Sequence, residues 1–127
     1  MILILLDSDK DPPCVLAPKL LKDATQNRSD VDMSCVLANV EYETWFVAAS
    51  SSLVAFLDLP AEVPEDPEAQ RLGKAWIERH FRGTKYSETL DQPAMTRKMD
   101  LGLCRERSRS FDKLCRELAS RLTGSSN

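Results

Sequence analysis

Three aspartates at alternate positions are the residues of this 127-residue chain whose spacing most directly suggests chemistry. Asp7, Asp9 and Asp11 follow the unbroken apolar run Ile2 to Leu6. Such a run, ending in acids, predicts a strand that is buried on both faces. Ligands of open α/β sheets bind beyond the carboxyl ends of the strands, where these acids fall. The three carboxylates therefore predict a site for Mg²⁺ or Mn²⁺, whose preferred ligands are oxygens. The alternative is a solvated turn that caps the next helix.

A second acidic pair is expected to join this site. Met33 to Val40 is apolar and partly β-branched, which predicts a second strand, and Val15 to Gln26 has the periodicity of a helix. Strand, helix and strand form a βαβ unit with parallel strands. Parallel strands end at the same edge, so Glu41 and Glu43 should lie near Asp7 and Asp9 and share their catalytic role. The alternative for Glu43 is the first turn of a helix, where an acid complements the dipole.

The rest of the chain predicts helices rather than strands. They are expected over Tyr42 to Leu57, from Asp66 to about Phe81, from Asp91 onward, and from Phe111 to Leu122. This gives an α/β fold in which a short parallel sheet is followed by several C-terminal helices. One domain is expected over 1–127, with an acidic-site half (1–57), a helical half (58–122) and a tail (123–127). Two strands leave both sheet edges bare, which favours completion of the sheet by a partner or a second copy of the chain.

Charge is distributed unevenly along the chain. Residues 1–63 carry 4 basic and 10 acidic side chains, whereas residues 64–127 carry 13 basic and 10 acidic ones. A basic surface beside a metal site suits a phosphate-rich substrate. Nucleic-acid contacts are therefore predicted for Arg105, Arg107, Arg109 and Lys113. The alternative is that these side chains form solvated helix faces.

Several classes of protein are disfavoured. The four cysteines form no CxxC pair and the single His80 is remote from them, which argues against a zinc site. The apolar start is too short to span a bilayer and lacks the features of a signal peptide, so a cytoplasmic protein without membrane contact is expected. Four glycines make a phosphate-binding P-loop improbable. Pro12 and Pro18 stand where an EF-hand requires Gly and Glu.

An apolar strand followed by Asp-x-Asp also resembles the haloacid-dehalogenase-type phosphatases. That resemblance would make Asp7 a nucleophile and Asp9 a general acid. The chain departs from the family at Asp11, where Thr or Val is expected, and it lacks a later strand that ends in paired acids.

Five stretches together resemble the bacterial family called domain of unknown function 4276, which is regarded as TOPRIM-like. They are Leu5 to Asp11, Ala17 to Leu21, Glu41 to Phe46, Asp91 to Pro93 and Ser108 to Leu114. The resemblance runs from Leu3 to about Leu118. It implies a TOPRIM-like partial fold that binds Mg²⁺ for phosphoryl transfer on nucleic acid, with an ATPase partner and a role in phage defence.

The resemblance also assigns individual residues. Asp7 and Asp9 match the Asp-x-Asp pair of TOPRIM domains, and Glu41 and Glu43 match an acidic stretch of the family itself. Ser110 and Phe111 match a Ser-Phe stretch of unknown role. The upstream strand and glutamate of TOPRIM enzymes have no counterpart before Ile2, so two hypotheses remain: a metal-dependent nuclease domain, or a truncated, non-catalytic interaction module.

Overall fold

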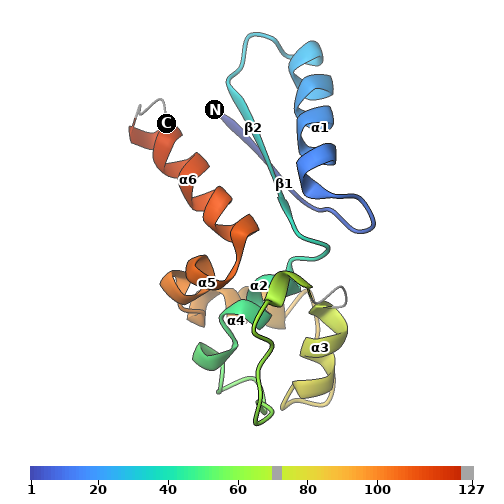
Figure 1. Ribbon diagram of the computed structural model, residues 1–127, viewed down its shortest axis with the longest axis vertical. Helices are drawn as coiled ribbons and strands as arrows, with labels where there is room; N and C mark the ends of the chain where they lie inside the picture. Colours follow the sequence, from blue (N-terminus) through green and yellow to red (C-terminus); the bar gives the residue numbers. More distant parts are fainter. Residues whose placement is uncertain (70–72, 124–127) are drawn as a thin grey trace.

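The computed structural model describes residues 1–69 and 73–123 (Figure 1). It is a mixed α/β fold in which two parallel strands are followed mainly by helices, as predicted. In chain order the elements are β1 (Ile2–Asp7), α1 (Pro13–Asn27), β2 (Met33–Ala38), α2 (Glu43–Ala48), η1 (Ser50–Ser52), η2 (Pro67–Ala69), α3 (Gly73–His80), α4 (Asp91–Lys98), α5 (Leu101–Arg107) and α6 (Arg109–Thr123).

The first three elements form the predicted βαβ unit. β1 and β2 pair in parallel, from Ile2 opposite Met33 to Asp7 opposite Ala38. Both strands therefore end at the same edge of the sheet. This confirms the prediction that the segments following the two strands begin side by side.

Helices cover both faces of this small sheet (Figure 1). On one face, Ala17 of α1 packs with Cys35 and Leu37 of β2. On the other, Phe111 and Leu114 of α6 belong to the same apolar cluster as the remaining buried residues of β2. The last helix of the chain thus returns to the sheet, and the sheet region has three layers.

The prediction that the first strand is buried on both faces is wrong. Ile2, Leu5 and Leu6 are 42%, 38% and 50% exposed, whereas β2 is buried from Ser34 to Ala38. The reason is that α1 and α6 pack mainly against β2. An unbroken apolar run does not reveal whether a strand lies at the centre or at the edge of a sheet.

Two helix predictions were too long. The helix expected over Tyr42 to Leu57 ends at Ala48 and continues as a 3₁₀ turn and an irregular segment. The helix expected from Asp91 is interrupted at Met99, and Asp100 then caps α5 by accepting the N–H of Leu103 at 3.0 Å. Part of the helix expected from Asp66 lies outside the described residues, and the described parts are η2 and α3.

The helices α2 to α5 pack around an apolar core at the carboxyl end of the sheet (Figure 1). Trp45, Phe46, Leu53, Leu57, Ile77, Met95 and Cys104 are almost completely buried there. This core anchors the segments that reach the acidic edge.

Candidate functional site

The loops that follow β1 and β2 are joined by backbone and side-chain hydrogen bonds. Asp7 Oδ1 accepts the N–H of Tyr42 at 2.8 Å, and the N–H of Asp9 donates to the carbonyl of Val40 at 2.9 Å. The buried Ser8 hydroxyl accepts the N–H of Val40 at 2.7 Å. Residues more than thirty positions apart are thus fixed side by side at one edge of the sheet.

Backbone strain is concentrated in these two loops. Asp9 has φ 52° and Val40 has φ 66°, and both values fall in the left-handed region. A β-branched residue such as Val40 rarely adopts this conformation, which costs on the order of 1–3 kcal/mol. Strained residues of this kind cluster at functional sites, which supports a role for this edge.

The acidic side chains at this edge influence one another electrostatically. Partial desolvation raises the pKa of Asp7, and the nearby carboxylates of Glu43, Asp9 and Glu41 raise it further, against the lowering effect of the Tyr42 amide. The pKa of Glu41 is raised by burial in the same way, with contributions from Glu43 and Asp9. A cation bound among these groups would offset their repulsion.

Both glutamates also have structural partners. Glu41 Oε1 accepts the backbone N–H of Lys74, in the first turn of α3, at 3.3 Å. Glu43 is 3% exposed, and its Oε1 accepts from the Tyr86 hydroxyl at 3.0 Å and from Gln92 Nε2 at 3.3 Å. Burial raises the pKa of Tyr86, and Glu43 raises it further, so that the phenol remains a donor. Glu43 is the first residue of α2, the position that the alternative interpretation expected.

Asp11 lies in an exposed turn, where its N–H donates to the carbonyl of Ser8 at 3.0 Å. This geometry fits the turn interpretation of the third aspartate, whereas the Asp7 side chain and the Asp9 backbone N–H are hydrogen-bonded to the second loop.

A cavity of about 280 Å³ opens beside Asp7. Its wall consists of Leu5, Leu6, Asp7, Ala38, Tyr42 and Gln92. Tyr42 and Gln92 received no role from the sequence. The available signal was their position within the Glu41 to Phe46 and Asp91 to Pro93 stretches of the family resemblance.

The donor set at this edge suits a hard cation. Within residues 1–69 and 73–123, no three His, Cys, Asp or Glu side chains are grouped closely enough to form a ready metal site. Mg²⁺, however, is commonly held by only one or two carboxylates together with water molecules. Asp7 and Asp9 supply such a pair, and the desolvated Asp7 carboxylate among like charges is the observation that fits a bound cation.

The four predicted nucleic-acid contacts occupy different surroundings. Arg105 Nε donates to Asp112 at 2.7 Å, and Arg107 donates to the backbone carbonyls of Ala48 and Pro64. Arg109 is 86% exposed and lies 4.0 Å from Asp66. Lys113 lines a second cavity, of about 390 Å³, between the beginnings of α1 and α6. Arg107 therefore fastens α5 to its neighbours, whereas Arg109 presents its charge to solvent.

The Ser-Phe stretch joins α6 to the helical core. Ser110 Oγ accepts the indole N–H of Trp45 at 2.8 Å and donates to Glu68 Oε1 at 2.8 Å. Phe111 packs edge-on against Trp45, with ring centroids 5.1 Å apart. Glu68 received no role from the sequence, where it falls within the helix expected from Asp66 to about Phe81.

Comparison with protein families identifies one match. The family model described as Domain of unknown function (DUF4276) matches residues 1–119. The chain belongs to this family. The match to DUF4276 includes both acid clusters, the Asp91 to Pro93 stretch and the Ser-Phe stretch, which confirms the resemblance drawn from the sequence.

No curated protein and no solved structure matches the chain. None of the described helices of this DUF4276 protein combines the length and apolar composition that spanning a bilayer requires. The geometry of the acidic edge is therefore the basis for its function.

Proposed function

We propose that this DUF4276 protein is a TOPRIM-like nuclease domain that uses Mg²⁺ or Mn²⁺ to hydrolyse nucleic-acid phosphodiesters. The observation that carries the proposal is the convergence of Asp7, Asp9 and Glu41 at the carboxyl edge of two parallel strands, where Asp7 lines a cavity of about 280 Å³. Ligands of α/β folds bind at such edges. The family resemblance supplies the further proposal of an ATPase partner in phage defence.

Each acidic residue has a distinct part in this proposal. Asp7 and Asp9 would hold the metal, which when bound supplies Lewis-acid stabilisation of the charge that develops on the phosphoryl oxygens. Glu41, whose pKa is raised, would accept the proton of the attacking water as the new phosphorus–oxygen bond forms and the bond to the leaving oxygen breaks. Glu43 accepts from Tyr86 and from Gln92, and would keep Gln92 in position at the wall of the cavity. Arg109 and Lys113 would contact neighbouring phosphates.

Calorimetric titration with Mg²⁺ and Mn²⁺ tests the metal site directly. The wild type should bind saturably, and Asp7→Asn/Asp9→Asn should lose binding because both charged ligands are removed. Asp23→Asn, which changes an exposed aspartate of α1, is the matched control and should bind like the wild type. Asp7→Asn should also abolish metal-dependent cleavage of nucleic acid. Undiminished cleavage by this variant would refute the assignment.

A non-catalytic interaction module is the second candidate, and the exposure of β1 favours it. The strand presents Leu5 and Leu6 to solvent, and its outer edge is unpaired within the described sheet. Edge strands of this kind readily add a further strand. Self-association that Leu6→Lys abolishes, together with no metal binding by the wild type, would favour the module over the nuclease. Light scattering measures the association.

A further inference from the structure

The outer edge of β1 presents backbone groups that lack a partner strand. The N–H of Ile2 donates to the carbonyl of Asp32 at 2.8 Å, so the backbone of Ile2 faces β2. The backbone groups of successive strand residues point to opposite edges, and the odd-numbered residues of β1 therefore face outward. The described sheet has only the strands β1 and β2. The outward N–H and C=O groups without a strand to pair with belong to Leu3, Leu5 and Asp7.

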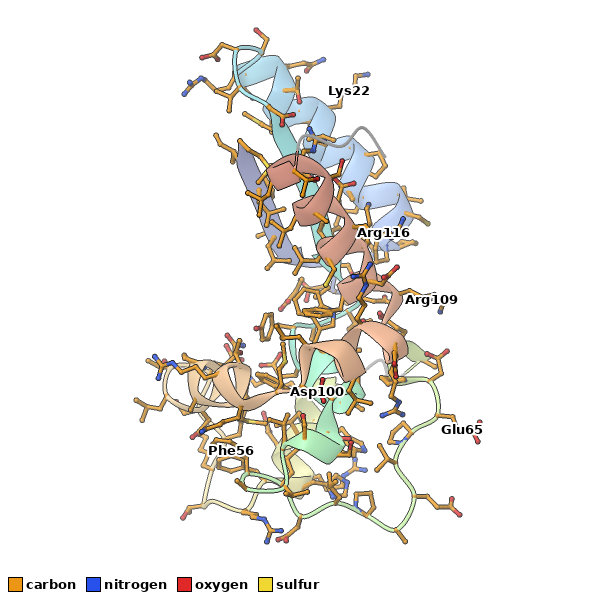
Figure 2. All side chains as sticks on the ribbon, turned by 90° about the vertical axis from the view of Figure 1, so that its left-hand side faces the viewer. Lys22, Phe56, Glu65, Asp100, Arg109 and Arg116 are labelled. Carbon is orange, nitrogen blue, oxygen red and sulfur yellow. The ribbon has the colours of Figure 1, made fainter. Side chains whose placement is uncertain are left out.

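Apolar side chains border this edge on both faces of the sheet. Ile4 packs with the apolar cluster at α1, and Leu3 packs with the cluster that includes residues of α6. Because side chains alternate along a strand, Ile2 and Leu6 lie on the α1 side and Leu5 lies on the α6 side. These three side chains are 38–50% exposed. Figure 2 shows β1 at the margin of the sheet region, on the side away from α1.

The edge has none of the features that keep edge strands from pairing. Such strands are commonly protected by a lysine, a proline or a bulge. Ile2 to Leu6 contains no charged residue and no proline. The pairing of β1 with β2 is continuous from Ile2 to Asp7, and the positive φ angles of Asp9 and Val40 fall beyond the strands. The edge is therefore straight, apolar and open to a further strand.

We propose that β1 pairs antiparallel with β1 of a second copy of this chain, about a two-fold axis at Ile4. The result is a four-stranded sheet in the order β2, β1, partner β1, partner β2. A two-fold axis perpendicular to the sheet keeps α1 of both copies on one face and α6 of both copies on the other. This inference holds for either candidate function, because it uses the strand edge and not the acidic side chains.

The position of the axis follows from the length of the strand. With the axis at Ile4, Leu3 forms a hydrogen-bonded pair with the partner's Leu5, as the outward direction of both residues requires. Ile2 lies opposite the partner's Leu6 in a pair without backbone hydrogen bonds. An axis at Leu3 or at Leu5 would leave strand residues unpaired at one end. The register centred on Ile4 therefore pairs the most residues.

Self-complementarity identifies a second copy as the occupant of this edge. The exposed Ile2 and Leu6 cover each other, so apolar side chains meet apolar side chains along the strand. Asp7 falls opposite the partner's Met1, which places the two Asp7 residues roughly 20 Å apart at about 3.3 Å per residue. This separation exceeds the Debye length of about 8 Å at physiological salt, so the two acidic edges repel each other little. A parallel arrangement would bring these edges together.

The second copy would also extend the cavity beside Asp7. Leu5 and Leu6 belong to the wall of that cavity. In the proposed register they lie opposite the partner's Leu3 and the partner's Ile2. Each acidic edge would thus be bordered by the beginning of the other copy's β1.

Light scattering of the full chain over a range of concentrations tests the association. A six-residue strand pair is a small interface, so the wild type should be a dimer at a concentration on the order of 100 μM. Leu5→Pro removes an outward N–H and leaves the ladder with β2 intact, because proline is tolerated where the N–H faces away from the sheet. It should raise the dimer dissociation constant at least tenfold, since each dimer loses two hydrogen bonds. Leu5→Val, which keeps the N–H, is the matched control and should dimerise like the wild type.

A monomeric wild type at this concentration would overturn the proposal and leave the edge to a strand of another protein. Equal dimerisation by Leu5→Pro and Leu5→Val would place the dimer interface elsewhere and overturn it as well. Circular dichroism verifies that Leu5→Pro is folded. If it is not, the cross-linking experiment that follows decides the question.

Disulfide cross-linking tests the register. Ile2→Cys and Leu6→Cys are prepared separately in a Cys14→Ser background, because Cys14 is an exposed native thiol. A pair without backbone hydrogen bonds brings the Cα atoms to about 4.5 Å, a distance that a disulfide accepts. Oxidation with diamide should therefore link a mixture of the two variants, while neither variant should link to itself. No link in the mixture, or equal linking of Leu6→Cys alone, would refute the register.

The double substitution Asp7→Asn/Asp9→Asn separates this dimer from the proposed nuclease site. The variant should dimerise with an unchanged dissociation constant, since neither carboxylate takes part in the strand pair. Absence of metal binding would therefore leave the dimer proposal intact, and a monomeric protein that binds metal would leave the nuclease proposal intact. Loss of dimerisation in this variant would contradict the strand pairing described here.

Discussion

At the scale of single residues, Asp7 is the group whose surroundings differ most from those of a solvated aspartate. Its carboxylate is partly desolvated and lies among the charges of Glu43, Asp9 and Glu41, while the Tyr42 amide stabilises its ionised form. Its folded pKa therefore lies above the unfolded value of 3.8. Such an arrangement is expected at a functional site where a bound cation would offset the repulsion between the carboxylates.

This residue makes the stability of the metal-free protein depend on pH. A raised folded pKa means that the native state binds more protons, so the contribution of Asp7 is favourable below pH 3.8 and becomes unfavourable as the pH rises through the folded pKa. Asp7→Asn keeps an acceptor for the Tyr42 amide and should raise the free energy of unfolding at neutral pH, with no gain at acidic pH. Urea unfolding at several pH values measures this difference. Mg²⁺ should stabilise the wild type and leave Asp7→Asn unchanged; a destabilised variant at neutral pH would contradict the interpretation.

At the scale of elements, α6 is the helix that contacts both the sheet and the helical core. It packs on β2, its first turn donates to Glu68, and its Ser110 accepts the Trp45 indole N–H from α2. The Ser-Phe stretch of the family thus fixes the start of α6. The Ser-Phe stretch therefore has a structural role, and no catalytic role is needed to explain it.

Ser110→Ala should therefore destabilise the fold although alanine is a better helix former. The substitution leaves the Trp45 N–H without its acceptor and removes a donor from Glu68, with a cost of about 1–3 kcal/mol. Ser51→Ala, at an exposed serine of η1, is the control and should change stability by less than about 0.5 kcal/mol. Chemical denaturation compares the two variants. Equal stability would show that the Ser110 bonds contribute little.

At the scale of the whole molecule, the acidic edge depends on how closely α3 packs against α2. A Cβ added to Gly73 would lie 2.8 Å from both the N and the Oγ1 of Thr44. This close approach of α3 to α2 positions the Lys74 N–H that Glu41 accepts. Position 73 therefore requires glycine, because a side chain does not fit there. The position of Glu41 at the acidic edge depends on this glycine.

Gly73→Ala should push α3 away and reduce stability by roughly 1–3 kcal/mol, the usual effect of overpacking. Metal-dependent cleavage should weaken as well, because Glu41, the proposed proton acceptor, loses its fixed position. Gly102→Ala is the control, because Gly102 lies at an exposed position of α5 and its added Cβ meets Asp100 Oδ1 at 3.4 Å, an ordinary contact distance. Thermal unfolding and cleavage assays of both variants give the comparison, and unchanged cleavage by Gly73→Ala would argue against the proposed role of Glu41.

The sequence by itself determined the features that depend on local pattern. Two apolar runs and the helical periodicity between them identified the β1–α1–β2 unit and hence the shared edge of Asp7, Asp9, Glu41 and Glu43, since parallel strands must end together. The family was indicated by the resemblance of five short stretches of sequence. Helix ends at Ala48 and Met99 were missed because apolar spacing continues through turns that the packed core imposes.

Only the tertiary structure decided which groups are buried and with whom they pair. The exposure of β1 depends on where α1 and α6 pack, and the partners of Glu43 and Glu68 lie about forty or more residues away along the chain. Burial and hydrogen bonding between distant segments leave no local periodicity. The sequence could therefore place carboxylates at one edge, whereas the burial of Glu68 and the exposed outer edge of β1 became visible only in the folded chain.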